Sequence, residues 1–158
     1  MAPSHSIRRR LGRVIRLDRR QKALVAEAVF WLTVARLGLM AVPFPVLARR
    51  LGDFVPPTDA RVIACAAAGP TANAETARRV RRAVAAAGRT LPFEAVCLPR
   101  AMAARAMLYR RGIPSALHFG AARGPEKSFE AHAWLNAAGI EVTGYPVASR
   151  FAEIACFV

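Results

Sequence analysis

The chain contains 158 residues, of which 54% are hydrophobic, and its 24 Lys and Arg residues against 10 Asp and Glu give a formal net charge of +14. This length and apolar fraction predict one compact domain with a packed core, and they exclude a disordered chain or two ordinary domains. The positive charge favours an acidic peptide or protein as partner, because attraction between opposite charges speeds their encounter.

The N-terminal region, residues 1–57, begins with a basic run. No aromatic residue lies within that run, and no zinc-ligand spacing occurs in the sequence, so we expect neither specific nucleic-acid binding nor a metal site, and no cofactor. The basic residues are Arg8, Arg9, Arg10, Arg13, Arg16, Arg19, Arg20 and Lys22.

An apolar run follows at residues 21–42 (QKALVAEAVFWLTVARLGLMAV), and we expect it to form a helix largely buried in the domain or against a partner. Glu27 and Arg36 interrupt the run, which argues against a membrane span. A basic and polar stretch precedes it and no small-residue cleavage site follows, which argues against a secretory signal. An interfacial membrane anchor is an alternative, because a basic stretch followed by an apolar helix is also typical of such anchors.

Prolines, glycines and capping residues divide the next part of the chain into shorter helices. The pair Pro56-Pro57 separates residues 1–57 from a core region at 58–158. The predicted helices span residues 46–50, residues 60–68 with Thr58-Asp59 as the cap, and residues 74–87 with Asn73 as the cap and Gly88 as the stop.

The C-terminal half changes from helical to strand-like sequence. Good helix formers, Pro99 in the first turn and Gly112 as a stop predict a helix over residues 98–111. Helices first and strands last predict an α+β fold, with the helix after Cys97 packed on a short antiparallel sheet. The predicted strands are residues 115–121, 129–136 and 140–145.

Cys97 and His132 are the candidate catalytic residues. At a helix N-terminus, unpaired backbone N–H groups and the positive end of the dipole favour a thiolate and can hold an oxyanion, so Cys97 is the candidate nucleophile. His132 lies on the middle predicted strand, on the face of Trp134, and its small alanine neighbours suit close packing on the helix. It is the candidate general base. Alternatively, both are ordinary core residues of a non-catalytic basic binding module.

The other cysteines and histidines are weaker candidates. Cys65 and Cys156 lie in apolar runs and are predicted to be buried, while His118 is a rival base on the preceding strand. The cysteines are widely spaced and odd in number, which indicates no disulfide framework and favours a reducing, cytoplasmic setting.

Three segments resemble the lasso-peptide maturation peptidases, a transglutaminase-like, papain-related family of cysteine proteases. The segments are CLPRA at 97–101, RRGIPSALHFG at 110–120 and AHAWL at 131–135. The resemblance implies a papain-related core that removes the leader from a ribosomally made precursor peptide, with Cys97 as nucleophile and His132 as base. It also implies a separate leader-recognition protein and the lasso cyclase as partners.

The third member of the expected triad departs from the family pattern. Some relatives place an acid where this chain has Gly144-Tyr145, and a hydrogen bond is needed to fix the imidazole tautomer. Glu141 is the nearest carboxylate and therefore the candidate, whereas Asn136, a backbone carbonyl or a water are alternatives. Acyl transfer to an amine on the same fold is an alternative to hydrolysis.

Overall fold

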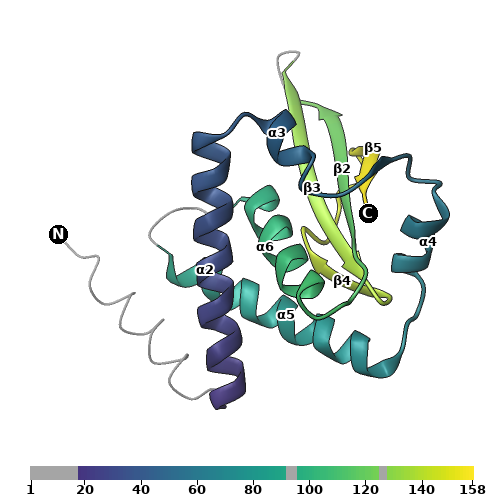
Figure 1. Cartoon of the computed structure of the whole chain (residues 1–158). Helices are drawn as coiled ribbons and strands as arrows, with labels where there is room; N and C mark the ends of the chain where they lie inside the picture. The colour runs from purple at the N-terminus through teal and green to yellow at the C-terminus, as the bar shows by residue number, and fades with distance from the viewer. Residues whose placement is uncertain (1–17, 92–95, 125–127) are drawn as a thin grey trace.

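The computed structural model describes residues 18–91, 96–124 and 128–158, which form helices and one antiparallel sheet (Figure 1). The helices precede the main strands in the chain, which confirms the predicted α+β fold. The helices are α2 (Arg19–Ala41), α3 (Phe44–Ala48), α4 (Ala60–Ala66), α5 (Thr71–Thr90) and α6 (Cys97–Tyr109), and the strands are β1 (Phe54–Val55), β2 (Ala116–Arg123), β3 (Phe129–Ala137), β4 (Ile140–Thr143) and β5 (Ala152–Phe157).

The strands lie in the order β1-β5-β2-β3-β4, and each neighbouring pair is antiparallel. The predicted strands correspond to β2, β3 and β4, but β1 and β5 were not predicted. β1 has only two residues, and β5 buries its last three residues in a row, so neither gives the alternation that marks a half-buried strand. The last strand of the chain therefore lies inside the sheet, between β1 and β2.

One face of the sheet is covered by α6, and α2 and α5 pack on α6 in turn (Figure 1). Alanines line the contact between α6 and the sheet: Ala101, Ala104 and Ala133 are at most 2% exposed. Their small side chains let the helix and the strands approach closely, as the sequence predicted for the alanines around His132, although of these only Ala133 is buried and Ala131 is exposed. The larger side chains buried in the same core include Leu32, Val80, Met107, Leu108, Leu117 and Leu135.

Helix α5 is longer than predicted at both ends. It begins at Thr71, just after Pro70, so Asn73 is a helical residue and not the cap. Gly88 lies inside the helix and does not end it. A Cβ atom at Gly88 would come within 3.3 Å of Nε of Arg100 on α6, so the glycine provides room for that side chain.

The two short helices differ from their predicted bounds by about one turn or less. Helix α3 begins at Phe44, two residues earlier than predicted, and ends at Ala48. Helix α4 ends at Ala66 and begins after Asp59, whose carboxylate accepts a hydrogen bond from the backbone N–H of Arg61 at 2.9 Å. The predicted cap of α4 is thus confirmed.

Helix α2 is buried in the domain along one face only, so the expectation that the domain buries most of it is wrong, and burial against a partner stays a prediction. Val25, Ala28, Leu32 and Ala35 recur at helical spacing and face the core. On the opposite side, large apolar side chains are exposed, among them Met40 at 72%. By length and composition α2 could cross a membrane, with a mean hydropathy of 1.6 and 22% of its most apolar stretch buried.

Candidate active site

Cys97 is the first residue of α6, as predicted, and it is the partly exposed one of the three free cysteines. Val96 at the cap makes no side-chain hydrogen bond to the first turn. Pro99 has no N–H and that of Arg100 donates to the carbonyl of Val96, so the N–H groups of Cys97 and Leu98 are the ones in this turn that can bind a negative charge. A thiol at this position can act as a nucleophile, whereas Cys65 and Cys156 are buried.

His132 lies on β3 with its imidazole ring held on three sides. Its Nε2 atom is 2.6 Å from the carbonyl oxygen of Gly144. The ring stacks on Trp134 at 5.9 Å between centroids and contacts Phe151 at 5.2 Å. Because a carbonyl oxygen can only accept, Nε2 carries the proton and Nδ1 is the basic nitrogen.

The backbone explains why Gly144 reaches His132. Gly144 has a φ of +83°, and a Cβ atom there would lie 2.4 Å from the carbonyl oxygen of Ala133. Only glycine combines this conformation with such a close approach to β3. The orienting group is therefore a backbone carbonyl, one of the alternatives that the sequence left open.

The predicted contact between Glu141 and His132 is not formed. Glu141 is exposed, and its Cα atom lies opposite Asn136, toward the far end of β3 from His132. It lines a shallow groove with three α5 arginines, Arg78, Arg81 and Arg82. The tight turn at Ala138-Gly139 pairs Ala137 with Ile140 and therefore Asn136 with Glu141, which leaves Glu141 four residues along β3 from His132.

Cys97 and His132 face opposite sides of the sheet. Cys97 packs against the core cluster that contains Ala133 and Leu135, whereas the ring of His132 lies with Trp134 on the other face. Within the described residues, no hydrogen bond joins the thiol to the imidazole. However, β4 pairs with β3 only from Leu135 onwards, so the outer edge of β3 beside His132 has no strand partner in the described part of the chain.

A different thiol and imidazole are in contact. Sγ of Cys156 lies 3.3 Å from Nδ1 of His118, and Glu153 contacts both side chains. Burial and the neighbouring Glu153 carboxylate raise the pKa of the Cys156 thiol well above its usual range. This buried thiol is therefore unsuited to nucleophilic attack. The sequence missed the cluster because β5, which carries two of its members, was not predicted.

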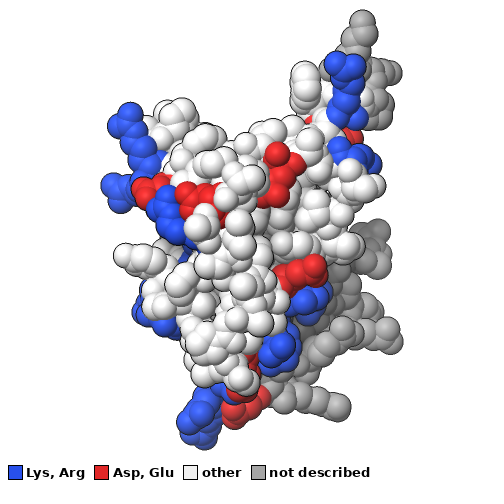
Figure 2. Space-filling model, turned by 90° about the vertical axis from the view of Figure 1, so that its right-hand side faces the viewer, with Lys and Arg blue, Asp and Glu red and all other residues white. Residues whose placement is uncertain are grey.

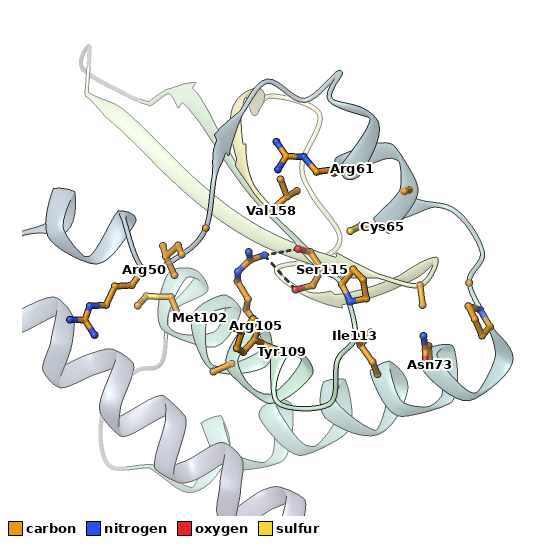
Figure 3. Close-up of a pocket in the computed structure, with 18 of the residues that line it drawn as sticks. Arg50, Arg61, Cys65, Asn73, Met102, Arg105, Tyr109, Ile113, Ser115 and Val158 are labelled. Carbon is orange, nitrogen blue, oxygen red and sulfur yellow. Dashed lines mark hydrogen bonds between the residues drawn. The ribbon is translucent and has the colours of Figure 1, made fainter.

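A cavity lies between the second half of α6, α4 and the segment before β2 (Figure 3). Its volume is about 950 Å³. Arg105 points into it and donates hydrogen bonds to the backbone oxygens of Ser115, at 2.5 Å, and Phe157, at 3.1 Å. Its lining contains no Asp or Glu and also includes Arg49, Arg50 and Arg61. Neither Cys97 nor His132 lines this cavity.

The face that carries α4 shows how the charge is distributed (Figure 2). Uncharged residues cover most of this view, and acidic groups lie among the basic ones. Asp53 and Asp59, for example, both pair with Arg61. The excess of basic residues is therefore not gathered into one continuous patch on this face.

The fold and Cys97 together define a class of protein: an α+β domain with a cysteine at the start of a helix that packs on an antiparallel sheet. Residues 38–156 match the transglutaminase-like superfamily. The chain therefore belongs to the transglutaminase-like superfamily, whose members are generally cysteine-dependent enzymes such as proteases and acyl transferases. No curated protein and no solved structure gave a significant match.

Proposed function

We propose that the protein is a cysteine peptidase that removes the leader from a ribosomally made lasso-peptide precursor, with Cys97 as the nucleophile. The observation that carries the proposal is the position of Cys97. It is a partly exposed thiol on an uncapped helix N-terminus in a chain of the transglutaminase-like superfamily.

The proposed reaction runs through an acyl-enzyme. Nδ1 of His132 takes the proton of Cys97, and the thiolate sulfur bonds to the carbonyl carbon of the scissile peptide. The backbone N–H groups at the start of α6 stabilise the oxyanion. The imidazolium then protonates the leaving amine as the C–N bond breaks, and water hydrolyses the thioester. Before the reaction the carbonyl of Gly144 holds the Nε2 proton, which fixes the tautomer that leaves Nδ1 free to accept a proton.

This reaction requires His132 to reach Cys97 around the edge of the sheet. The side chain of Cys97, on α6, and that of His132, on β3, lie on opposite sides of the sheet. The outer edge of β3 near His132 carries no paired strand within the described residues. The imidazole therefore leaves its stacked position beside Trp134 before it accepts the proton. We expect binding of the precursor to drive that movement, as substrate binding completes other catalytic sites.

The proposed substrate is a peptide with acidic residues. The cavity beside α6 has arginines but no Asp or Glu in its lining, and the whole chain carries an excess of positive charge. The proposed partners are a separate leader-recognition protein and the lasso cyclase, in the cytoplasm. The exposed apolar side of α2, with Phe30, Leu37 and Met40, is a candidate surface for one of them.

A second candidate function is a non-catalytic binding module. The observation that favours it is the separation of Cys97 from His132 on opposite faces of the sheet. In that case Cys97 is a half-buried helix residue, and its replacement changes stability and not turnover.

Cleavage of the precursor peptide tests the proposal. The purified chain is incubated with precursor and leader-recognition protein, and the products are identified by mass spectrometry. We expect a single cut at the end of the leader for the wild type, and none for Cys97→Ala or His132→Ala. Addition of a primary amine distinguishes the acyl transferase alternative, because the product then carries the amine.

Cys156→Ala is the matched control, since this thiol is buried beside His118 on the other side of the sheet from Cys97 and does not line the cavity. Circular dichroism confirms that each variant is folded. Wild-type turnover in folded Cys97→Ala would rule out the nucleophile, and the same result in His132→Ala would rule out the base.

A further inference from the structure

A thiol, an imidazole and a carboxylate meet on the α4 side of the sheet, at the junction of β2 and β5. His118 and Cys156 are register partners on these strands, and Glu153 precedes Cys156 on β5. Nδ1 of His118 is 2.5 Å from Oε1 of Glu153, and Sγ of Cys156 is 3.0 Å from the same oxygen. We propose that His118, Glu153 and Cys156 form a binding site for a divalent cation of the zinc class.

The donor set matches what zinc prefers. Zinc binds cysteine sulfur at about 2.3 Å and histidine nitrogen or carboxylate oxygen at about 2.0 Å. The three donor atoms lie 2.5, 3.0 and 3.3 Å from one another, so a cation among them requires Nδ1 and Oε1 to move apart through small side-chain shifts. Thiolate and imidazole together favour zinc over magnesium or calcium, which take oxygen ligands.

The side chains of the proposed cation site are held in position by packing, and the site is open to solvent on one side. The His118 ring stacks parallel to Trp134 at 5.4 Å between centroids, which fixes its plane. His118 is 5% exposed and Cys156 is fully buried, whereas the Glu153 side chain is 32% exposed and leads to solvent. Three protein ligands with one open side are typical of zinc sites that keep a water as the fourth ligand.

Cation binding replaces hydrogen bonds that the three side chains now make to each other. The Cys156 thiol donates to Oε1 of Glu153, and on binding it loses this proton to solvent. The His118 ring proton moves from Nδ1 to Nε2, so the ring stays neutral and Nδ1 becomes a ligand. Nε2 is buried and makes no hydrogen bond within the described residues, so this change of tautomer replaces an unpaired buried acceptor with an unpaired buried donor.

The cation would tie β5 to β2. A ligand that binds only the folded state raises the melting temperature with its concentration. We therefore expect zinc to stabilise the fold, through an effect that is independent of Cys97 and of peptide cleavage.

The test uses the full chain, treated with a chelator and then titrated with Co²⁺ and Zn²⁺ separately. We expect one Co²⁺ per chain, with the near-ultraviolet charge-transfer absorption of a cysteine–cobalt bond, and its loss when Zn²⁺ is added. We also expect Zn²⁺ to raise the melting temperature of the wild type.

Two variants and one control locate the site. Cys156→Ser is expected to abolish the cobalt absorption. Glu153→Gln, at a partly exposed position, is expected to weaken zinc binding at least about 100-fold, because loss of an outer partner alone costs roughly 10–100-fold. Cys97→Ser keeps the wild-type metal affinity. Absence of the cobalt absorption in the wild type, or equal zinc affinity in the wild type and folded Glu153→Gln, would overturn the proposal and leave a purely hydrogen-bonded cluster.

Discussion

The two faces of the sheet are built from different residues although the same strands supply both. The face toward α6 is apolar, with Leu117, Ala133 and Leu135 almost completely buried. The opposite face carries His118, His132 and Cys156. Strand alternation lets one segment contribute aliphatic side chains to the core under α6 and imidazole and thiol side chains to the other face. The difference teaches that substitutions at neighbouring positions of one strand have different consequences, according to the face on which each side chain lies.

The largest loss of stability is expected from a substitution on the apolar face of the sheet. Leu135→Ala removes a fully buried side chain from the contact between β3 and α6, and is expected to lower the free energy of unfolding by about 2–5 kcal/mol. Urea unfolding followed by circular dichroism measures the change. Ile154→Ala on β5 is the control, because Ile154 is 62% exposed and its truncation should have little effect. Equal losses in both variants would contradict the assignment of the two faces.

A smaller loss of stability is expected from a substitution at Gly120, where the side chain of Trp134 packs closely on the strand. A Cβ atom at Gly120 would lie 2.8 Å from Cζ3 of Trp134, so Gly120→Ala forces the indole away from its histidine neighbours. We expect a loss of about 1–3 kcal/mol, measured by thermal or urea unfolding. Gly38→Ala in α2 is the matched control: its Cβ meets Leu47 at an ordinary 3.6 Å, and alanine favours a helix. A destabilised Gly38→Ala with an unaffected Gly120→Ala would refute this packing.

An ion pair between helix α2 and the segment just after α6 tests the contribution of a polar contact on the helical side of the sheet. Arg111, just after α6, donates to both carboxylate oxygens of Glu27 on α2, at 3.1 and 2.6 Å. Glu27→Gln is expected to cost about 1 kcal/mol, because hydrogen bonds between charged groups exceed neutral ones. Urea unfolding at neutral pH measures the loss.

The same contact predicts a pH dependence. The hydrogen bonds from Arg111 lower the pKa of Glu27 below its ordinary value of 4.5. A carboxyl whose pKa is lower in the folded state stabilises fully above the unfolded value, and that contribution disappears as pH falls through the folded value. The difference in stability between wild type and Glu27→Gln should therefore shrink below pH 4.5 and stay constant above it. A difference that grows on acidification would contradict the ion pair.

The smallest effect is expected at an exposed ion pair on the edge of the sheet. Arg150 donates to Glu130 at 2.6 Å, but their side chains are 62% and 37% exposed. Solvent and salt screen such pairs, so Glu130→Gln should change the free energy of unfolding by less than about 1 kcal/mol. The comparison with Glu27→Gln, made in parallel at low and high salt, shows whether burial sets the strength of ion pairs here.

The sequence predicted the parts of the fold that local signals define. Asp59 caps α4, Cys97 begins α6, and His132 shares its face with Trp134, as expected from capping and alternation. The bounds of α2 were predicted to within two residues, but the length of α5 was not, because Gly88 is read as a stop unless its contact with Arg100 is known.

The candidate site was predicted only in part. Which side chains come into contact depends on the register of the strands and on pairing between strands far apart in the sequence. Glu141 lies opposite Asn136 because the turn at Ala138-Gly139 is short, and the sequence did not determine the length of that turn. The contact between His118 and Cys156 depends on β5 pairing with β2, which joins segments from either side of the β3–β4 hairpin. Periodicity reports what lies within one element and carries no information about its distant partner.

The inner position of β5 has a consequence for how the protein is made. A ribosome synthesises β2, β3 and β4 before residues 152–157, so for that time β2 has an unpaired edge and β1 has no partner at all. Unpaired strand edges attract other chains, and long-range pairings form slowly. The nascent chain is therefore most prone to aggregate just before its synthesis reaches β5, and chaperones that shield strand edges have their greatest effect on yield at that stage.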